Sequence, residues 1–245
     1  MSINTLLYLK NIKMKHLLYS LMLTTAVAIC VCSCSDDDND PTRVTPTITG
    51  TFIDERDSFE YHWVRIGKLD WSCENLHYDL GNSAKCQIYQ PAWADGSPTP
   101  IDIYSEKYGR LYTVSGAIES IPEGWRLPTD ADWQQLEQAF GMSADETNKR
   151  EWRGNIAQLL LEKGEGTANL GIQLCGYTSI HDHTTRTDWL YMSVFGYYWT
   201  ATTDTAKNDV SSFYRKLAYN KKEVYRESTE AEKYFFSVRF VRDAQ

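Results

Sequence analysis

The sequence of 245 residues lacks the features by which many enzymes and nucleic-acid-binding proteins are recognised. Positive charge is scarce, because 25 Lys and Arg stand against 33 Asp and Glu and leave a formal net charge of −8. A surface of that sign repels phosphate groups, so we expect no nucleic-acid partner. The Gly-x-Ser-x-Gly sequence of a nucleophile elbow is also missing.

Metal-ligand patterns are missing as well. There are five His residues, and His181-Asp182-His183 lies in a polar stretch without a Cys or His partner at ligand spacing, which favours a solvated loop. Asp130 and Asp132 lie in the first turn of an expected helix, where carboxylates complement the helix dipole. We therefore expect a protein that is not an enzyme, with no catalytic residue, no metal and no cofactor.

Aromatic side chains, in contrast, are plentiful. The sequence has 8 Trp, 16 Tyr and 8 Phe, and 42% of its residues are apolar. This composition supplies a packed core and is too apolar for a disordered chain. No linker interrupts the sequence after Thr51, so we expect one compact domain over residues 51–245.

One long apolar run, residues 17–31, follows Lys10, Lys13 and Lys15 near the N-terminus. Its length is that of the apolar region of a secretory signal and is short of the roughly 20 residues that span a bilayer. The pattern therefore predicts a signal peptide over residues 1–33. The alternative is an ordinary membrane anchor that is not removed.

The end of this segment, Val31-Cys32-Ser33-Cys34, resembles a bacterial lipobox. In such a sequence the thiol of the last Cys receives a diacylglyceryl group, and the chain is cut just before that Cys. The small side chain of Ser33 favours Cys34 as the lipidated residue. The resemblance implies a membrane partner, reached through a lipid on the N-terminal Cys of the mature chain.

Ser35, Asp36, Asp37 and Asp38 follow the predicted lipidation site directly. Because the acidic side chains repel one another, we expect residues 34–50 to form an extended, flexible tether. An acidic run at this place resembles the surface-export signal of Bacteroidetes lipoproteins. The resemblance implies an outer-membrane lipoprotein exposed at the cell surface, and a plain solvated tether is the alternative.

The hydrophobic pattern predicts strands and two helices in the domain. Strands are expected over residues 59–66, 69–73, 108–114, 170–177, 196–203, 212–218 and 234–241. One helix is expected to begin after Thr129, which forms a capping box with Asp132, and to end at Gly141. A second is expected over residues 149–163, with Trp152 on its apolar face. Because the helices are grouped between strands, this order predicts an α+β fold.

Five ordered motifs carry a resemblance to a known family. They are Asp54-x-Arg56-Asp57 with Tyr61, Val64-x-Ile66-Gly67, Trp71 and Asn75-Leu76; residues 108–112; residues 124–129 with Asp132, Trp133 and Leu136; residues 198–202; and residues 237–243. In type and spacing they resemble the Fibrobacter succinogenes major paralogous domain family. The resemblance implies a C-type-lectin-like fold, with twisted antiparallel sheets and two helices, in surface or secreted proteins of undetermined function.

The cysteines depart from that family. Members commonly carry a Cys pair where this sequence has Ile121 and Phe240, and an apolar contact can replace such a cross-link. The domain keeps Cys73, Cys86 and Cys175, for which a Cys73–Cys86 disulfide and buried free thiols are both open. The Glu-Pro-Asn or Gln-Pro-Asp motif of true C-type lectins is missing, so calcium-dependent sugar binding has no support.

Loop aromatics are the remaining candidates for ligand contact. Trp93 lies in a turn-rich stretch, and Trp189 and Tyr191 follow the His-containing loop. Extracellular domains use exposed aromatic residues on loops to stack on sugar rings or to hold protein partners. The alternative is that the loops themselves cover these rings.

These observations predict a surface-anchored, non-enzymatic lipoprotein that binds a glycan or a protein. The loops at residues 89–104 and 178–195 are the expected contact regions. The alternative is a structural or assembly subunit of a cell-surface structure that has no small ligand.

The variant Cys34→Ala is expected to stay unlipidated and unprocessed, because the thiol that would carry the lipid is removed. Growth with radiolabelled fatty acid followed by gel electrophoresis measures this directly. The Cys32→Ala variant is the control and should be labelled as the wild type is. Label that still enters the Cys34→Ala protein would show that Cys34 is not the lipidated residue.

Overall fold

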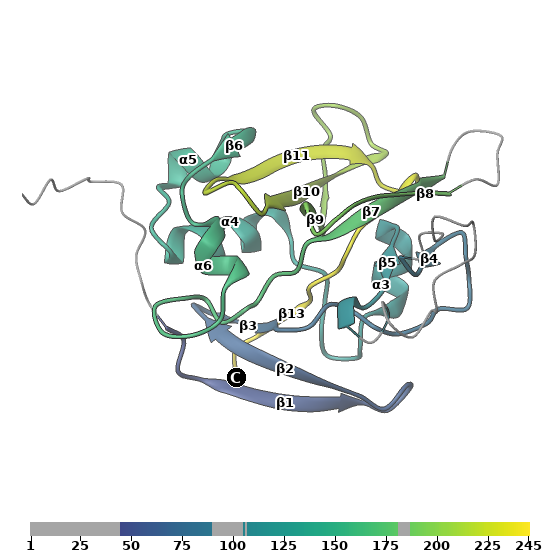
Figure 1. The fold of residues 1–245 in the computed structure, drawn as a ribbon, viewed down its shortest axis with the longest axis horizontal. Coiled ribbons are helices and arrows are strands. Elements are labelled where there is room, and N and C mark those ends of the chain that lie inside the picture. Colours follow the sequence, from purple (N-terminus) through teal and green to yellow (C-terminus); the bar gives the residue numbers. More distant parts are fainter. Residues whose placement is uncertain (1–44, 90–104, 106, 181–186) are drawn as a thin grey trace, which may run out of the picture. The chain divides into compact units, whose positions relative to one another are not determined.

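The computed structural model describes residues 45–89, 105, 107–180 and 187–245 (Figure 1). The predicted signal peptide and the His-containing loop lie outside the described residues. The same holds for six residues with predicted roles: Cys34, Ser35, Asp36, Asp37, Asp38 and Trp93.

Helices are grouped in the middle of the domain, between two sets of strands. In chain order the elements are β1 (Thr49–Asp54), β2 (Phe59–Ile66), β3 (Leu69–Ser72), β4 (Cys86–Gln87), β5 (Leu111–Tyr112), α3 (Val114–Ser120), α4 (Asp130–Ala139), α5 (Ala144–Asn148), β6 (Glu151–Arg153), α6 (Ala157–Leu161), β7 (Cys175–Ile180), β8 (Thr187–Met192), β9 (Phe195–Thr203), β10 (Ser211–Ala218), β11 (Val224–Glu230), β12 (Tyr234–Phe235) and β13 (Val241–Asp243). The α+β class predicted from the sequence is confirmed. β1 begins two residues before the predicted start of the domain.

Two sheets contain most of the strands. The smaller sheet has the order β1-β2-β3-β13 and lies at the bottom of Figure 1. The larger sheet has the order β12-β7-β9-β10-β11-β6, with β8 paired to β7, and lies at the top. Neighbouring strands in it run antiparallel, except that β7 and β9 are parallel. The first and last described strands share the smaller sheet, so that sheet joins the two ends of the domain.

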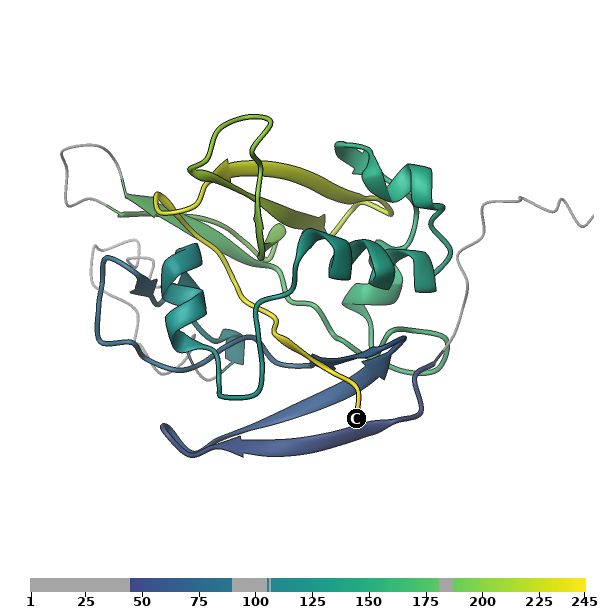
Figure 2. The ribbon, with the colours of Figure 1, turned by 180° about the vertical axis from the view of Figure 1, so that it is seen from behind.

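The main core lies between the two sheets, around α4 and α6 (Figures 1 and 2). Trp71 of the smaller sheet packs edge to face on Trp133 of α4, with 5.1 Å between ring centroids. Leu159 of α6 and Tyr198 of the larger sheet belong to the same buried cluster. Burial of these large side chains is the main favourable contribution that holds the layers together.

A second core cluster lies beside α3. Trp199 of β9 is fully buried in it, stacks on Phe236 at 4.3 Å, and donates a hydrogen bond from Nε1 to the carbonyl oxygen of Tyr112 at 2.7 Å. Ile121 and Phe240 both belong to this cluster. At the two positions where the resemblance implies a Cys pair, this chain therefore has two apolar residues of one core cluster.

The helix predicted after Thr129 is confirmed as α4. The hydroxyl of Thr129 accepts a hydrogen bond from the backbone N–H of Asp132 at 3.1 Å, and the Asp132 carboxylate accepts one from the Thr129 N–H at 2.7 Å. This is the expected capping box, and it closes the first turn of the helix.

The helix predicted over residues 149–163 is wrong. Strand β6 and the short helix α6 occupy this stretch, and Gly154 separates them with a φ of +68°. A left-handed residue interrupts a helix, and a Cβ at Gly154 would come within 2.6 Å of the Met142 sulfur. Trp152 therefore lies in a strand and pairs with Tyr225 of β11.

Other predicted boundaries also needed correction. Of the strand expected over residues 108–114 only β5 forms, because α3 begins at Val114 with Thr113 as its N-cap. The strand expected at 170–177 begins at Cys175, and the one expected at 234–241 is divided into β12 and β13. The described residues form four helices instead of two, and β1, β8 and β11 had not been predicted.

The described residues contain no helix that is both long enough and apolar enough to cross a membrane.

Replacement of Trp199 by Ala is expected to destabilise the domain by about 3–5 kcal/mol, because it removes a fully buried ring and leaves a cavity. Trp125→Ala is the matched control, since Trp125 is only half-buried and rests on Phe52 at 4.9 Å. Its cost should be clearly smaller. Urea unfolding followed by fluorescence measures both free energies, and equal losses would contradict this description of the second cluster.

Candidate functional site

Buried ion pairs hold α4 against one face of the larger sheet. Asp130 of α4 accepts hydrogen bonds from Arg215 of β10 and Arg226 of β11, each at 2.7 Å. Glu137 of α4 accepts from Arg215 at 2.7 Å and from Arg153 of β6 at 2.8 Å. Burial opposes ionisation of Asp130, but the hydrogen bonds from its two arginines hold its pKa below the ordinary value. These arginines therefore define the inner face of the sheet.

The opposite face of the sheet carries aromatic side chains. Because side chains alternate along a strand, the neighbours of the three arginines point away from α4. The register pairs Lys216 with Tyr197 of β9 and with Tyr225 of β11, and it pairs Tyr225 with Trp152 of β6. Trp152, Tyr225, Lys216 and Tyr197 thus form one line across four strands, which we call the aromatic row.

More aromatic rings surround the aromatic row. Tyr177 of β7 lies 5.0 Å from Tyr197, and Phe195 of β9 lies 6.1 Å from it, both in edge-to-face contact. Such distances are typical of favourable aromatic pairs. The aromatic row and its flanking rings are together called the aromatic face; the flanking rings are Tyr177, Tyr191, Phe195, Tyr214 and Tyr234.

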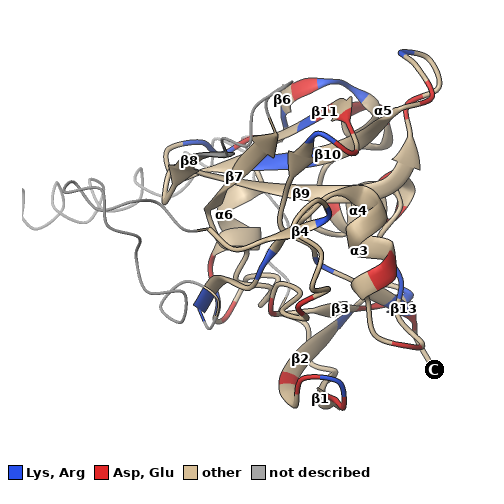
Figure 3. Cartoon of the chain, turned by 90° about the vertical axis from the view of Figure 1, so that its right-hand side faces the viewer, with Lys and Arg blue, Asp and Glu red and all other residues tan. Residues whose placement is uncertain are grey.

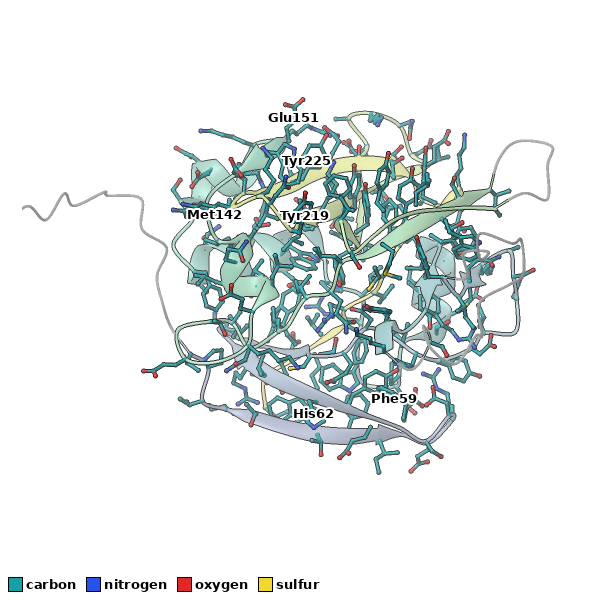
Figure 4. All side chains as sticks on the ribbon, in the orientation of Figure 1. Phe59, His62, Met142, Glu151, Tyr219 and Tyr225 are labelled. Atoms are coloured by element: carbon teal, nitrogen blue, oxygen red, sulfur yellow. The ribbon has the colours of Figure 1, made fainter. Side chains whose placement is uncertain are left out.

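The aromatic face is partly open to solvent. Most of its rings are half-buried, and only Tyr197 of those in the aromatic row is buried. Tyr225 and the exposed Glu151 lie together in the upper part of the molecule, far from Phe59 and His62 of the smaller sheet (Figure 4). Tyr225, at one end of the aromatic face, is therefore well separated from these two residues of the smaller sheet in this view.

Lys216 is the charged centre of the aromatic row. Its Nζ atom lies 3.9 Å from the ring centroid of Tyr225, 5.0 Å from that of Trp152 and 5.4 Å from that of Phe195. Within the described part of the chain, Nζ has no hydrogen-bond acceptor and no carboxylate partner. Burial lowers its pKa, because the surrounding rings replace water around the ammonium group.

Other charges lie close to the aromatic row. Lys221 has its Nζ 5.6 Å from the ring centroid of Trp152. Glu227 forms an ion pair with Arg150, and Glu151 is exposed. Strand β9 contains no charged residue and is tan in Figure 3, whereas the sequence of the neighbouring β10 includes Arg215 and Lys216. The cationic centre is therefore flanked by an uncharged strand on one side.

The residues proposed from the sequence divide between two environments. Tyr191 is 48% exposed and lies 5.3 Å from Phe195, at the margin of the aromatic face. Trp189 packs on Tyr89 at 5.6 Å, in a small cluster with Cys175 and Phe235. The structure thus brings Tyr191 to the aromatic face and places Trp189 in a packing contact elsewhere.

Sequence reasoning missed the aromatic row. The alternation of Phe195, Tyr197 and Trp199 was visible, but the same period of two is also found in a buried strand. Lys216 was unremarkable without its neighbours, and Tyr225 lies in a strand that had not been predicted. The available signal was the alternation of aromatic residues in the strand predicted over residues 196–203, and it points to Tyr197 alone of the aromatic row.

A groove lies farther along the larger sheet, beside α3. Its volume is about 680 Å³, and its lining includes Ile118, Val210, Ser212, Glu230 and Glu232. Ile118 and Val210 are 60% and 59% exposed, which is unusual for large apolar side chains. The groove therefore offers apolar surface in an otherwise polar setting.

The three cysteines of the domain are buried free thiols, and the Cys73–Cys86 disulfide is not formed. Burial raises the pKa of the Cys175 thiol to about 11, which keeps it protonated and unreactive near neutral pH. Among the described residues no group of three or more His, Cys, Asp and Glu side chains is arranged to hold a metal ion.

Several motif residues that carried the family resemblance have structural contacts. Arg239 is buried and donates to Asn75 Oδ1 at 2.8 Å and to the carbonyl oxygens of Ser72 and Leu170, each at 3.0 Å. These bonds tie the C-terminal segment to β3 and to the loop before β7. The two motifs that contain Asn75 and Arg239 therefore stabilise the fold.

The fold and these contacts define a mixed α+β domain closed by a C-terminal segment through buried polar bonds. The model of the Fibrobacter succinogenes major domain matches residues 64–242, and the chain belongs to this family. No curated protein and no solved structure matches the chain. The C-type-lectin-like architecture implied by the resemblance stays a prediction.

Lys216→Met is expected to change the free energy of unfolding by less than about 1 kcal/mol. The variant loses cation–π contacts worth roughly 0.5–2 kcal/mol but also loses the desolvation cost of a half-buried charge. The adjacent Arg215→Met is the contrast, because it removes a fully buried arginine shared by Asp130 and Glu137 and leaves each buried carboxylate with one arginine instead of two; it should cost about 3–5 kcal/mol. Urea unfolding measures both, and a loss above about 2 kcal/mol in Lys216→Met would assign Lys216 a structural role.

Proposed function

We propose that the protein is a non-enzymatic binding module, anchored to the outer membrane through Cys34 and exposed at the cell surface. Its ligand, a glycan or a protein, binds on the aromatic face. The observation that carries this proposal is the aromatic row, where three partly exposed or buried rings flank an unpaired ammonium group.

The composition of this sheet face supports a binding role. A sheet with one solvated face usually places polar residues at the outward positions. Here Trp152, Tyr225, Tyr214 and Phe195 occupy such positions on four different strands and are half-buried. Contiguous exposed aromatic surface is a common mark of an interaction site. Tyr and Trp suit this role because each combines a large ring with a polar atom.

One ring of the aromatic row, Tyr197, is packed into the core. Tyr197 stacks on Phe236 at 5.0 Å, and Phe236 stacks on the buried Trp199. The aromatic face thus continues into the second core cluster, so its geometry exists before any ligand arrives. Preorganisation of this kind lowers the entropy lost on binding.

The proposed anchoring rests on the N-terminal sequence. Cys34 follows a small residue at the end of an apolar run, and Asp36, Asp37 and Asp38 follow it closely. The tether would hold the domain away from the bilayer, which leaves the aromatic face accessible to extracellular ligands. A C-type-lectin-like architecture is part of the same proposal.

A structural or assembly subunit is the second candidate. The observation that favours it is the groove beside α3, where the exposed Ile118 and Val210 offer apolar surface to another subunit. Recovery of the native protein in a large, stable assembly, with its aromatic face shielded, would favour this candidate.

Tyr225→Ala and Trp152→Ala are expected to weaken ligand binding by about tenfold or more, because each removes a ring of the aromatic row. The matched control is Tyr219→Ala: Tyr219 is 61% exposed in the turn after β10 and has no aromatic-ring contact in the described structure. The full chain, purified in detergent, is tested on arrays of glycans and extracellular proteins. A ligand whose affinity does not respond to either row variant would place the binding site elsewhere.

A further inference from the structure

The aromatic row resembles a cation-binding cage that is already occupied. Rings of Trp and Tyr within about 6 Å of a positive charge form the usual site for quaternary ammonium and methylated lysine ligands. Here the protein's own Lys216 holds that place, with its Nζ atom over Tyr225 and near Trp152 and Phe195. A cationic ligand is therefore disfavoured by steric exclusion and by charge.

The ammonium group of Lys216 still lacks hydrogen-bond acceptors. A lysine ammonium has three donors, and aromatic rings satisfy them only weakly. In the described structure no acceptor lies within hydrogen-bond distance of this group. A half-buried ammonium group gains more from an anionic oxygen than from a neutral one, because the opposite full charges also attract each other and water screens them less at a partly buried site.

The charges in direct contact with the aromatic row are positive, although the whole chain is acidic. Lys221 adds a second positive charge near Trp152. Arg150 forms ion pairs with both Glu227 and Asp204, so it offsets only part of the negative charge of Glu227. Two carboxylates oppose an anion: burial, then Glu227, then the exposed Glu151 raise the pKa of Tyr225.

The rings beside Lys216 provide flat apolar surface for the rest of the ligand. Tyr225 and Trp152 are half-buried and meet edge to face at 5.1 Å, so part of each ring is open to solvent. A sugar ring presents C–H groups on one face and can rest on such a surface while an acidic substituent reaches Lys216. Aromatic surface with one central charge matches that mixture of apolar and anionic groups.

We infer that the aromatic face binds acidic sugars, with the ammonium group of Lys216 contacting a carboxylate or sulfate and with Tyr225 and Trp152 contacting the sugar ring. This inference rests on the proposed function, because it names the ligand class of the same face. It goes further in excluding neutral glycans as preferred ligands.

Polygalacturonate and its fully methyl-esterified form are the first pair of probes, since they share one backbone and differ in charge. A glycan array with acidic members and their neutral counterparts is the second. Its uronic or sialic acids test carboxylates, and its sulfated sugars test sulfate. The full chain in detergent is used throughout. The wild type is expected to prefer the acidic members of the pairs by about tenfold or more.

Four variants test the role of Lys216. Lys216→Met should lose this preference, whereas Lys216→Arg should keep much of it because the charge remains. Glu151→Gln should strengthen acidic binding by about twofold, since it removes an opposing charge near Tyr225. Tyr219→Ala should bind as the wild type does. Urea unfolding checks that each variant is folded, and Lys216→Arg keeps the test valid if Lys216→Met is unstable.

Each outcome has a distinct meaning. Acidic binding that depends on Lys216 and Tyr225 supports the inference. Equal binding of the neutral probes, or binding that Lys216→Met does not change, overturns it. A protein ligand lost in Tyr225→Ala, without binding to any acidic glycan, overturns the inference and leaves the proposed function standing. If no row variant affects any ligand, the proposed function fails, and the inference fails with it.

Discussion

The buried contact between α4 and three arginines determines which side of the larger sheet faces the core. Asp130 and Glu137 hold Arg215, Arg226 and Arg153 inward through hydrogen bonds of 2.7–2.8 Å. Removal of either carboxylate would leave a buried charge without a partner, which is strongly unfavourable. Because side chains alternate along a strand, a shift of the strand register by one residue would turn the aromatic row toward the core and the arginines toward solvent. The same ion pairs therefore stabilise the core and present the aromatic face.

Arg239 has a similar effect at the other end of the domain. Its bonds to Asn75 and to the carbonyl oxygen of Ser72 join the last segment of the chain to the end of β3 and the residues after it. In the same segment, β13 pairs with β3 as an edge strand of the smaller sheet. The family resemblance was recognised partly through Asn75 and Arg239. They stabilise a shared fold and have no contact with the aromatic row, so membership in the family identifies the architecture without identifying a ligand.

Local signals predicted those elements whose ends are encoded in neighbouring residues. α4 was predicted correctly because Thr129 and Asp132 satisfy each other's backbone groups within one turn. The helix expected over residues 149–163 failed because the spacing of Trp152 and Ile156 suits a helix, although each residue is buried by a different partner. Pairing of β6 with β11 is a contact between distant parts of the chain, and it outweighed the local pattern. A weak intrinsic preference is readily overridden by tertiary packing in this way.

The sequence alone determined the α+β class, the family, the capped helix and an acidic chain with unusually many aromatic residues. Tertiary structure decided where those aromatic residues meet. Trp152 and Tyr197 lie far from each other and from Lys216 and Tyr225 in the sequence, and only the register of four strands places the four residues in one line. Tyr191 could be selected from sequence as a loop aromatic, but Trp189 lies two residues away on the same strand, so alternation alone would give both the same environment. The left-handed backbone of Tyr191, with a φ of +65°, is visible only in the structure. Alternation along a strand divides its side chains between the two faces of the sheet. Which of the two faces is buried depends on residues distant in the sequence that pack against it.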